Sequence, residues 1–306
     1  LDFTKIPIAH NPSGAPPNFQ YGPSLQPAIL GSGVTLMSIA IVFVTIRLYT
    51  GIKKAGKLFA DDYLCLVALV FELTQWFVFY PALNQGMGKH TWDIPVSAVS
   101  EDVLKRQIST QMINCAAFFP AKGAILVFFL RVFGRLRWVR ITCYVLLVLI
   151  VIAYGTPEVA WLARCIPHQG QKWDNTVLQR CESVQGIFIM TGVCSVALDL
   201  AIFIIPLPII HSLKLDKQKK RGLAVVFMFG FLVLAASTVG LAYRIILYRG
   251  TDDPLWHGVN LYISAYCEVF GTIIVSCAPA ISSFWTNIFT QTKLYASFRS
   301  TIGSSK

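Results

Sequence analysis

Ionisable side chains occur inside several apolar stretches of this sequence, and their chemical types could support proton transfer. They comprise four carboxyl groups, one amine and one guanidinium, carried by Glu72, Lys122, Glu158, Asp199, Arg244 and Glu268. A charge at the centre of a bilayer is costly unless it finds a counter-ion, water or the interface. A carboxyl group that burial keeps protonated can act as a general acid. We therefore assign the catalytic role to Glu72, Lys122, Asp199 and Glu268.

Lys122 is the residue that most needs a partner, because it lies in the middle of the long apolar segment 108–132. Asp199 is the best candidate partner, because it lies in the middle of segment 184–212 and therefore at a similar depth in the membrane. The pair either orients a substrate and relays protons or only fixes the register of two helices, and both interpretations stay open. Arg244 and Glu268 lie closer to an interface, where we expect a structural pair.

Aromatic residues accompany two of the carboxyl groups at helical spacing. Glu72, Trp76 and Tyr80 follow one another every four residues, and Tyr154 lies four residues before Glu158. Such residues share a helix face, although aromatic belts at membrane interfaces produce the same pattern. Acids among aromatic rings suit a pocket for a lipophilic, unsaturated ligand, whose developing positive charge the rings would stabilise. The predicted binding residues are Trp76, Tyr80, Tyr154, Glu158, Arg244 and Tyr266.

Seven segments are long and apolar enough to position these side chains across a membrane. The chain is 55% hydrophobic and only 13% charged, whereas soluble proteins carry about 25% charged residues. A helix of about 20 apolar residues crosses a bilayer and satisfies its own backbone hydrogen bonds there. The sequence predicts an all-α bundle of seven transmembrane helices over residues 28–48, 62–82, 108–132, 139–162, 184–212, 223–248 and 259–284.

Basic residues set the predicted orientation and exclude nucleic acid as a partner. The net charge is +11, but the lysines and arginines gather in short loops, as the positive-inside rule expects. Sixteen lie at one end of the predicted helices and eight at the other. The N-terminus is therefore placed outside and the C-terminus in the cytoplasm. The basic run at 217–221, in the loop between the fifth and sixth helices, would contact anionic lipids or a cytoplasmic partner.

Three regions follow from this topology. Residues 1–27 contain six prolines and form an extended segment, residues 28–286 form the membrane domain, and residues 287–306 form a short cytoplasmic tail. The chain is predicted to be a multi-pass protein of the plasma membrane or an endomembrane. Cys165 and Cys181 bracket the outer loop between the fourth and fifth helices. They would form a disulfide in an oxidising compartment, while two free thiols remain the alternative.

Several familiar activities lack their motifs here. No nucleotide-binding, zinc or calcium spacing occurs, and an aspartate-rich magnesium motif is absent, so neither a metal nor a cofactor is implied. A retinal protein carries its Schiff-base lysine in the last helix, whereas Lys122 lies in the third. The motifs of common G-protein-coupled receptors are replaced by Leu130-Arg131-Val132 in the third helix and Ala278-Pro279-Ala280 in the seventh.

Short motifs along nearly the whole chain resemble the fungal rhodopsin-like integral membrane family, the type named for a satratoxin-cluster protein. They are Arg47-Leu48-Tyr49-Thr50, Asp61-Asp62-Tyr63, Gly86-Met87-Gly88-Lys89-His90, Trp92-Asp93, Lys122 with Leu130-Arg131-Val132-Phe133, Cys165, Trp173-Asp174, Cys181, Asp199 with Pro206-Leu207-Pro208, Asp252-Asp253-Pro254, Trp256 and Glu268. The third helix departs from the usual Leu-Thr-Lys-Leu-Ser pattern, with Pro120 and Gly123 beside the lysine. The resemblance implies a seven-helix fold and two kinds of activity, in pathogenicity-associated surface receptors and in secondary-metabolite clusters.

Two functions follow from these observations. The first is a cofactor-independent membrane enzyme that catalyses a redox-neutral, acid/base-driven cyclisation or isomerisation of a lipophilic polyketide or terpenoid intermediate. In it, Glu72 or Glu268 is the acid and Lys122 and Asp199 orient or relay. The alternative is a fungal seven-helix receptor of the pathogenicity-associated type, in which the same cavity binds a ligand. A transporter is disfavoured, because an odd number of helices without an internal repeat does not suggest alternating access.

Overall fold

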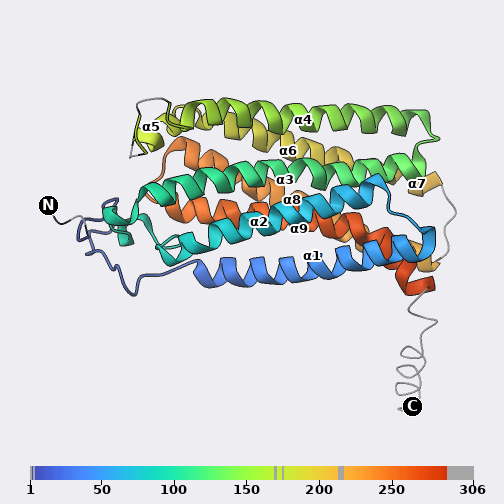
Figure 1. Ribbon diagram of the computed structural model, residues 1–306, viewed down its shortest axis with the longest axis horizontal. Coiled ribbons are helices and arrows are strands. Elements are labelled where there is room, and N and C mark those ends of the chain that lie inside the picture. The colour runs from blue at the N-terminus through green and yellow to red at the C-terminus, as the bar shows by residue number, and fades with distance from the viewer. Residues whose placement is uncertain (1, 3, 169–170, 174–175, 213–216, 288–306) are drawn as a thin grey trace, which may run out of the picture.

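Long helices run side by side through the protein, as the computed structural model shows (Figure 1). The structure describes residues 2, 4–168, 171–173, 176–212 and 217–287. Within this part of the chain, seven helical spans are long and apolar enough to cross a membrane, and no strand is formed. The predicted all-α fold with seven membrane-spanning helices is confirmed.

The helices differ from their predicted ranges mainly at the ends. In chain order they are α1 (Gln26–Ala55), α2 (Ala60–Asn84), α3 (Glu101–Phe133), α4 (Arg137–Cys165), α5 (Thr176–Glu182), α6 (Gln185–Ile204), α7 (Pro206–Ser212), α8 (Lys217–Arg249) and α9 (Pro254–Asn287), with short 3-10 helices η1 (Thr91–Asp93) and η2 (Val96–Ala98). The fifth span therefore consists of α6 and α7. The break falls before Pro206, whose ring cannot continue the hydrogen bonding of an α-helix.

The N-terminal segment packs on the loop between α2 and α3. The amide of Ile8 donates to the carbonyl of Ile94 at 3.0 Å, and the amide of Val96 donates to the carbonyl of Ile6 at 2.9 Å. Both lie at the same end of the bundle as the N-terminus (Figure 1). We name this the outer end, following the orientation that the basic residues predict, and the opposite end the inner end.

Two predicted regions extend beyond the described residues. The cytoplasmic tail 287–306 lies outside them after its first residue, as do residues 213–216 of the basic loop and the side chains of the run at 217–221. The cytoplasmic partner expected at this loop therefore stays a prediction.

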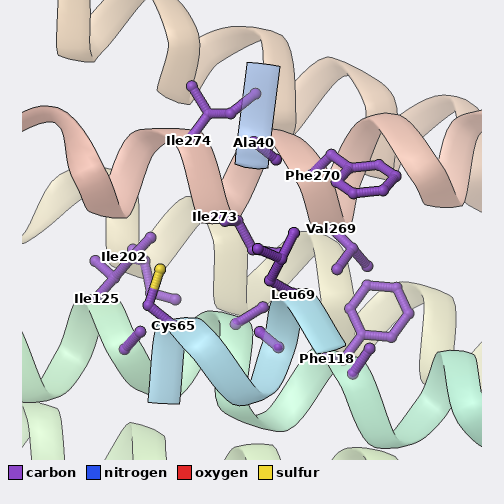
Figure 2. Close-up of a cluster of buried hydrophobic side chains, with 14 of the residues drawn as sticks. Ala40, Cys65, Leu69, Phe118, Ile125, Ile202, Val269, Phe270, Ile273 and Ile274 are labelled. Carbon is purple, nitrogen blue, oxygen red and sulfur yellow. The ribbon is translucent and has the colours of Figure 1, made fainter. Parts of the chain in front are cut away.

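Helices α3 and α9 form the centre of the bundle. In each, 61% of the most apolar stretch is buried, against 17% in α8. Apolar side chains from several helices meet around them, among them Leu69 of α2, Phe118 and Ile125 of α3, Ile202 of α6 and Phe270 of α9 (Figure 2). In the middle of the bundle, polar groups on the inward faces of α3 and α9 are therefore removed from both lipid and water.

A disulfide closes the outer end of α4. Cys165 at the end of α4 is bonded to Cys181 in α5, with their Cα atoms 4.9 Å apart. The bond agrees with the sequence-based expectation, and it holds α5 against α4 beside the outer pocket described below.

Gly33 allows α1 and α2 to approach closely. A Cβ atom at this position would lie 2.0 Å from Cζ3 of the Trp76 ring, whereas one at Gly31 would meet nothing within 4 Å. Glycine is therefore required at position 33 by the packing of Trp76.

We expect Gly33→Ala to destabilise the protein by about 1–3 kcal/mol, the usual cost of overpacking a well-filled core. Gly31→Ala, two residues earlier on the same helix, is the matched control and should leave stability unchanged or slightly raised. Thermal unfolding of the two purified variants in detergent measures the difference. Equal melting temperatures would contradict the packing described for Trp76.

Candidate functional site

A cavity of about 470 Å³ opens between the outer ends of α3, α6, α8 and α9. The N-terminal segment and η1 contribute Ile8 and Thr91 to its wall, and α4 contributes Trp161. Its volume lies within the range of about 300–1,000 Å³ that is typical of small-molecule sites. We name this cavity the outer pocket.

Polar side chains line one side of the outer pocket. Gln107, Gln111 and Asn114 project from α3, Gln185 comes from α6, and Arg244 comes from α8. The spacing of the three α3 residues puts them on one helix face, which the sequence analysis did not recognise. The stripe crosses the predicted start of the helix at 108, whereas α3 begins at Glu101.

Arg244 has no carboxylate partner among the described residues. Its Nη1 atom donates to the carbonyl oxygen of Phe188 at 3.4 Å, a long hydrogen bond. The structural pair expected between Arg244 and Glu268 is not formed, because Glu268 binds Lys122 instead. Glu268, which the sequence analysis placed closer to an interface than Lys122, contacts Lys122 in the middle of the bundle instead.

An aromatic stack lies beside the outer pocket. The ring of His90 is sandwiched between Trp92 and Trp256, with centroid distances of 4.7 and 4.1 Å and interplanar angles of 7° and 10°. The Nδ1 atom of His90 lies 2.5 Å from Oδ2 of Asp253. Thr91 donates to Oδ1 of Asp253 from its amide at 2.9 Å and from its hydroxyl at 2.7 Å. These contacts fasten the α2–α3 loop to the start of α9.

Asp253 is held in its ionised form by the contacts of this stack. Burial by itself favours the neutral acid, but the hydrogen bonds from His90 and Thr91 outweigh burial and lower the pKa of the Asp253 carboxyl below its usual value. In the sequence, His90 and Trp92 stood out only as parts of the family motifs, and their closeness along the chain was the clue to the stacking.

The Lys122 side chain ends in a closed cluster of polar groups in the middle of the bundle. Its Nζ atom contacts a carboxylate oxygen of Asp199, Oε1 of Glu268 at 2.9 Å and Oγ of Ser195 at 3.3 Å. The ring of Phe118 lies 5.6 Å from the same nitrogen. Lys122 is fully buried, and the pair with Asp199 that depth suggested is present.

A chain of hydrogen bonds extends this cluster to α4. The hydroxyl of Tyr154 donates to Oγ of Ser195 at 2.8 Å, and Ser195 donates to Oε1 of Glu268 at 2.5 Å. Four helices, α3, α4, α6 and α9, thus contribute to one network. Such a network can hold a proton and pass it between oxygen atoms, and it also fixes the relative positions of the helices.

The buried cluster lies below the outer pocket. Asn114 and Ala265 line the pocket, and Lys122 follows Asn114 by eight residues, which corresponds to about 12 Å along α3. Glu268 lies one helical turn beyond Ala265 on α9. In the described part of the chain, none of the four predicted catalytic residues lines the pocket. The outer pocket therefore ends above the ion pairs of Lys122.

Glu72, Trp76 and Tyr266 form a second buried group between α2 and α9. Glu72 is fully buried, and Gln75, with its amide nitrogen turned toward it, donates to both carboxyl oxygens at 3.2 Å. The rings of Trp76 and Tyr266 meet edge to face at 5.5 Å. The Tyr266 hydroxyl of this group is buried without a hydrogen-bond partner among the described residues. The same holds for Oε1 of Glu158, which lies outside this group, on α4.

The helix face predicted to join Glu72 and Trp76 to Tyr80 does not reach Tyr80. Tyr80 is 45% exposed on the outside of the bundle, while Phe79 packs against Tyr262 with ring centroids 4.9 Å apart. At 3.6 residues per turn, a residue eight positions on is rotated by about 80°, whereas one seven positions on is rotated by only about 20°. Among the six predicted binding residues, Arg244 is the one placed on the described pocket wall.

A separate ion cluster ties the helices together at the inner end. Arg47 of α1 contacts Asp61 and, at 2.7 Å, Asp62 of α2, and it donates to the carbonyl oxygen of Ser276 in α9. Arg131 of α3 contacts Asp61 at 2.8 Å. The motifs that carried the family resemblance at 47–50, 61–63 and 130–133 thus meet in space. No group of three potential metal ligands gathers within the residues that the structure describes.

Comparison with known proteins gives a family. The model described as the fungal rhodopsin domain matches residues 46–287. A "SAT4 family membrane protein" of Emericella nidulans is 24% identical over 224 residues, which cover 72% of this chain and 56% of that protein. "Polyenoic acids biosynthesis gene cluster protein Ba17b" of Metarhizium anisopliae is 23% identical over 254 residues, covering 78% of this chain and 68% of that protein.

A third relative is similar over a shorter region. "Fugralins biosynthesis cluster protein 2" of Gibberella zeae is 27% identical over 124 residues, which cover 40% of this chain and 30% of that protein. The chain thus spans only about half the length of the first of these relatives and less of the third. No solved structure gives a significant match.

Lys122→Met should destabilise the protein by about 3–5 kcal/mol, because it leaves two buried carboxyl groups without their cation. Lys105→Met is the matched control on the same helix, since Lys105 forms an ion pair with Glu101 in which both side chains are about half exposed. Loss of that exposed pair should cost less than about 1 kcal/mol. Thermal unfolding in detergent compares the two, and similar losses would contradict the closed cluster.

Asp253→Asn should lower stability at neutral pH by about 2 kcal/mol, because the ionised carboxylate accepts hydrogen bonds from His90 and Thr91. A lowered folded-state pKa adds stability above the unfolded value of about 3.9, and this is lost as the pH falls through the folded value. The gap in melting temperature between wild type and variant should therefore begin to narrow as the pH falls below about 4 and shrink further with increasing acidity. The exposed neighbour Asp252 provides the control, Asp252→Asn, which should show no gap. A gap for Asp253→Asn that does not narrow at all between about pH 6 and pH 2 would refute the assignment.

Proposed function

Because this chain belongs to the fungal rhodopsin domain family, whose model covers most of its length, we propose that it is a membrane-embedded enzyme of secondary metabolism. It binds a lipophilic polyketide or terpenoid intermediate within the plasma membrane or an endomembrane. The observation that carries the proposal is the outer pocket, which has the volume of a small-molecule site and a wall of apolar and amide side chains. Two relatives are named for biosynthesis clusters, which supports this class of substrate.

The proposed reaction is a redox-neutral cyclisation or isomerisation. A proton adds to one carbon of the bound intermediate, a bond forms or shifts at the resulting cation, and a proton leaves from another carbon. Glu268 supplies or receives the proton, because it lies one turn below the pocket wall at Ala265 and accepts a hydrogen bond from Ser195. To reach the Glu268 carboxyl group, the ligand must displace the side chains that pack between it and the pocket wall, a depth of about one helical turn of α9. Lys122 and Asp199 then orient the Glu268 carboxyl group.

Glu72 is the second candidate acid of this proposal. It is a fully buried carboxyl group near Glu268, and the Gln75 amide is its described hydrogen-bond partner. Trp76 stands one turn further along α2 against Tyr266. A cation formed on a substrate that reached this level would be stabilised over their rings.

A receptor is the second candidate, and the closed ion cluster favours it. The ion pairs of Lys122 hold α3, α6 and α9 together beneath the outer pocket. A ligand bound above them that prefers another arrangement of these helices would shift the bundle toward that arrangement. The movement of these helices would alter the inner ion cluster around Arg47 and Asp61. It would also change the position of the basic loop between the fifth and sixth spans, where a cytoplasmic partner would bind.

Reconstitution in vesicles with a panel of polyketide and terpenoid precursors tests the enzyme. The expected product has the mass of its substrate but a different retention time, because a redox-neutral isomerisation or cyclisation adds and removes the same atoms. Glu268→Gln should lower its rate of formation by about 100-fold or more, since positioned acid/base catalysis contributes at least that factor.

The control for this experiment is Glu101→Gln, which alters an exposed carboxylate at the start of α3 and should leave the rate unchanged. Melting temperatures of both variants separate loss of chemistry from loss of folding. Binding of a precursor without any isomeric product across the panel would remove the enzyme and leave the receptor.

A further inference from the structure

The outer pocket contains a cation that forms no ion pair with a described carboxylate. Arg244 is the one charged side chain among the described residues of the pocket wall. Its described hydrogen bond is the long one to the carbonyl oxygen of Phe188. Glu268, the carboxylate whose charge acts on Arg244, forms its ion pair with Lys122. A guanidinium within a membrane-spanning helix is costly without an anionic partner. The pocket therefore favours a ligand that supplies a negative charge.

Packing against α6 fixes the position of the Arg244 side chain. The Arg244 stem crosses α6 at Gly192, where a Cβ atom would lie 2.9 Å from Cδ of Arg244 and 3.0 Å from Leu241. Any larger residue at position 192 would displace the arginine. The side chain is thus held against α6 in the wall of the pocket, so little conformational entropy is lost when a ligand binds.

The remaining polar groups of the pocket are neutral hydrogen-bonding groups. Gln107, Gln111 and Asn114 of α3 each carry an amide that can donate to an anion. Oδ1 of Asn114 is buried without a partner among the described residues, so this amide also retains an unused acceptor. A planar guanidinium binds a carboxylate through two parallel hydrogen bonds, and neutral amides do not compete for the charge.

We infer that the outer pocket selects a lipophilic monocarboxylate, whose carboxylate pairs with Arg244 and whose apolar chain lies against Val103, Leu104, Trp161 and Phe188. One positive charge in the wall matches one negative charge on the ligand. This inference rests on the proposed function only in that both use the same pocket, and it concerns binding rather than turnover. It also narrows the substrate class, because an intermediate held at Arg244 would present its unsaturated chain and not its carboxylate to other parts of the site.

A matched pair of ligands tests this selection directly. The protein is placed in nanodiscs of neutral phosphatidylcholine, and the dissociation constants of linoleic acid and its methyl ester are measured by quenching of tryptophan fluorescence. The two probes share one chain and differ in the charge of the head group. We expect the acid to bind at least 10-fold more tightly at pH 7.5, and we expect Arg244→Met to reduce this preference to about 1-fold.

Arg249→Met is the matched control, because Arg249 is an exposed arginine in the last turn of the same helix and does not line the pocket. It should retain the full preference for the acid. Arg244→Lys keeps the positive charge but loses the planar guanidinium, so it should retain part of the preference for the acid over the ester. This variant replaces Arg244→Met in the test if Arg244→Met does not fold. The wild-type comparison needs no variant.

Equal affinities of the wild type for acid and ester would overturn the inference, as would an unchanged preference in Arg244→Met. If phosphatidylglycerol added to the nanodisc competed for the pocket as strongly as free linoleic acid does, the inference would also be overturned. The pocket would then be assigned to a lipid head group. A clear acid preference without any isomeric product would leave this inference standing while the proposed enzyme fails. The two proposals are therefore separable.

Discussion

The structure depends on burying one ammonium group in the middle of a membrane-spanning bundle. Lys122 can be fully enclosed because Asp199 from α6 and Glu268 from α9 reach its nitrogen, and Ser195 completes its contacts. In surroundings of low dielectric constant each of these charges alone would be expelled or neutralised. Their mutual contacts therefore fix how α3, α6 and α9 are rotated against one another, and the apolar core follows that arrangement (Figure 2).

The two ion clusters and the outer pocket lie at different levels along the bundle. The Lys122 cluster fills the middle, the Arg47 and Asp61 cluster closes the inner end, and the outer pocket lies where the helix ends are held apart under the N-terminal segment. Arg244 is the charge that this arrangement leaves facing the pocket. A ligand of the proposed kind would therefore act on the protein in one of two ways, by pairing with Arg244 or by weakening the ion pairs beneath the pocket.

Three features could be predicted because each depends only on position in the sequence. The length of the apolar segments predicted the seven spans, the depth of the residues within them predicted the Lys122–Asp199 pair, and the position of the cysteines beside one loop predicted the disulfide. The sequence did not predict that Glu268 joins Lys122 rather than Arg244, since that choice depends on the rotation of neighbouring helices. Tyr80 was placed on the face of Glu72 because a repeat of four drifts from the true helical period over two turns. The amide stripe was visible in the sequence, but the apolar-length criterion began the helix at 108, so its first member, Gln107, fell outside the predicted helix.

A double-mutant cycle between Lys122 and Glu268 tests the central claim most directly. The free energy of unfolding is measured for the wild type, Lys122→Met, Glu268→Gln and the double variant in the same detergent. The contact predicts that the double variant loses less stability than the two single losses added together, by at least about 1 kcal/mol, as residues in one network show. Additive losses, equal within about 0.5 kcal/mol, would contradict an ion pair between these helices.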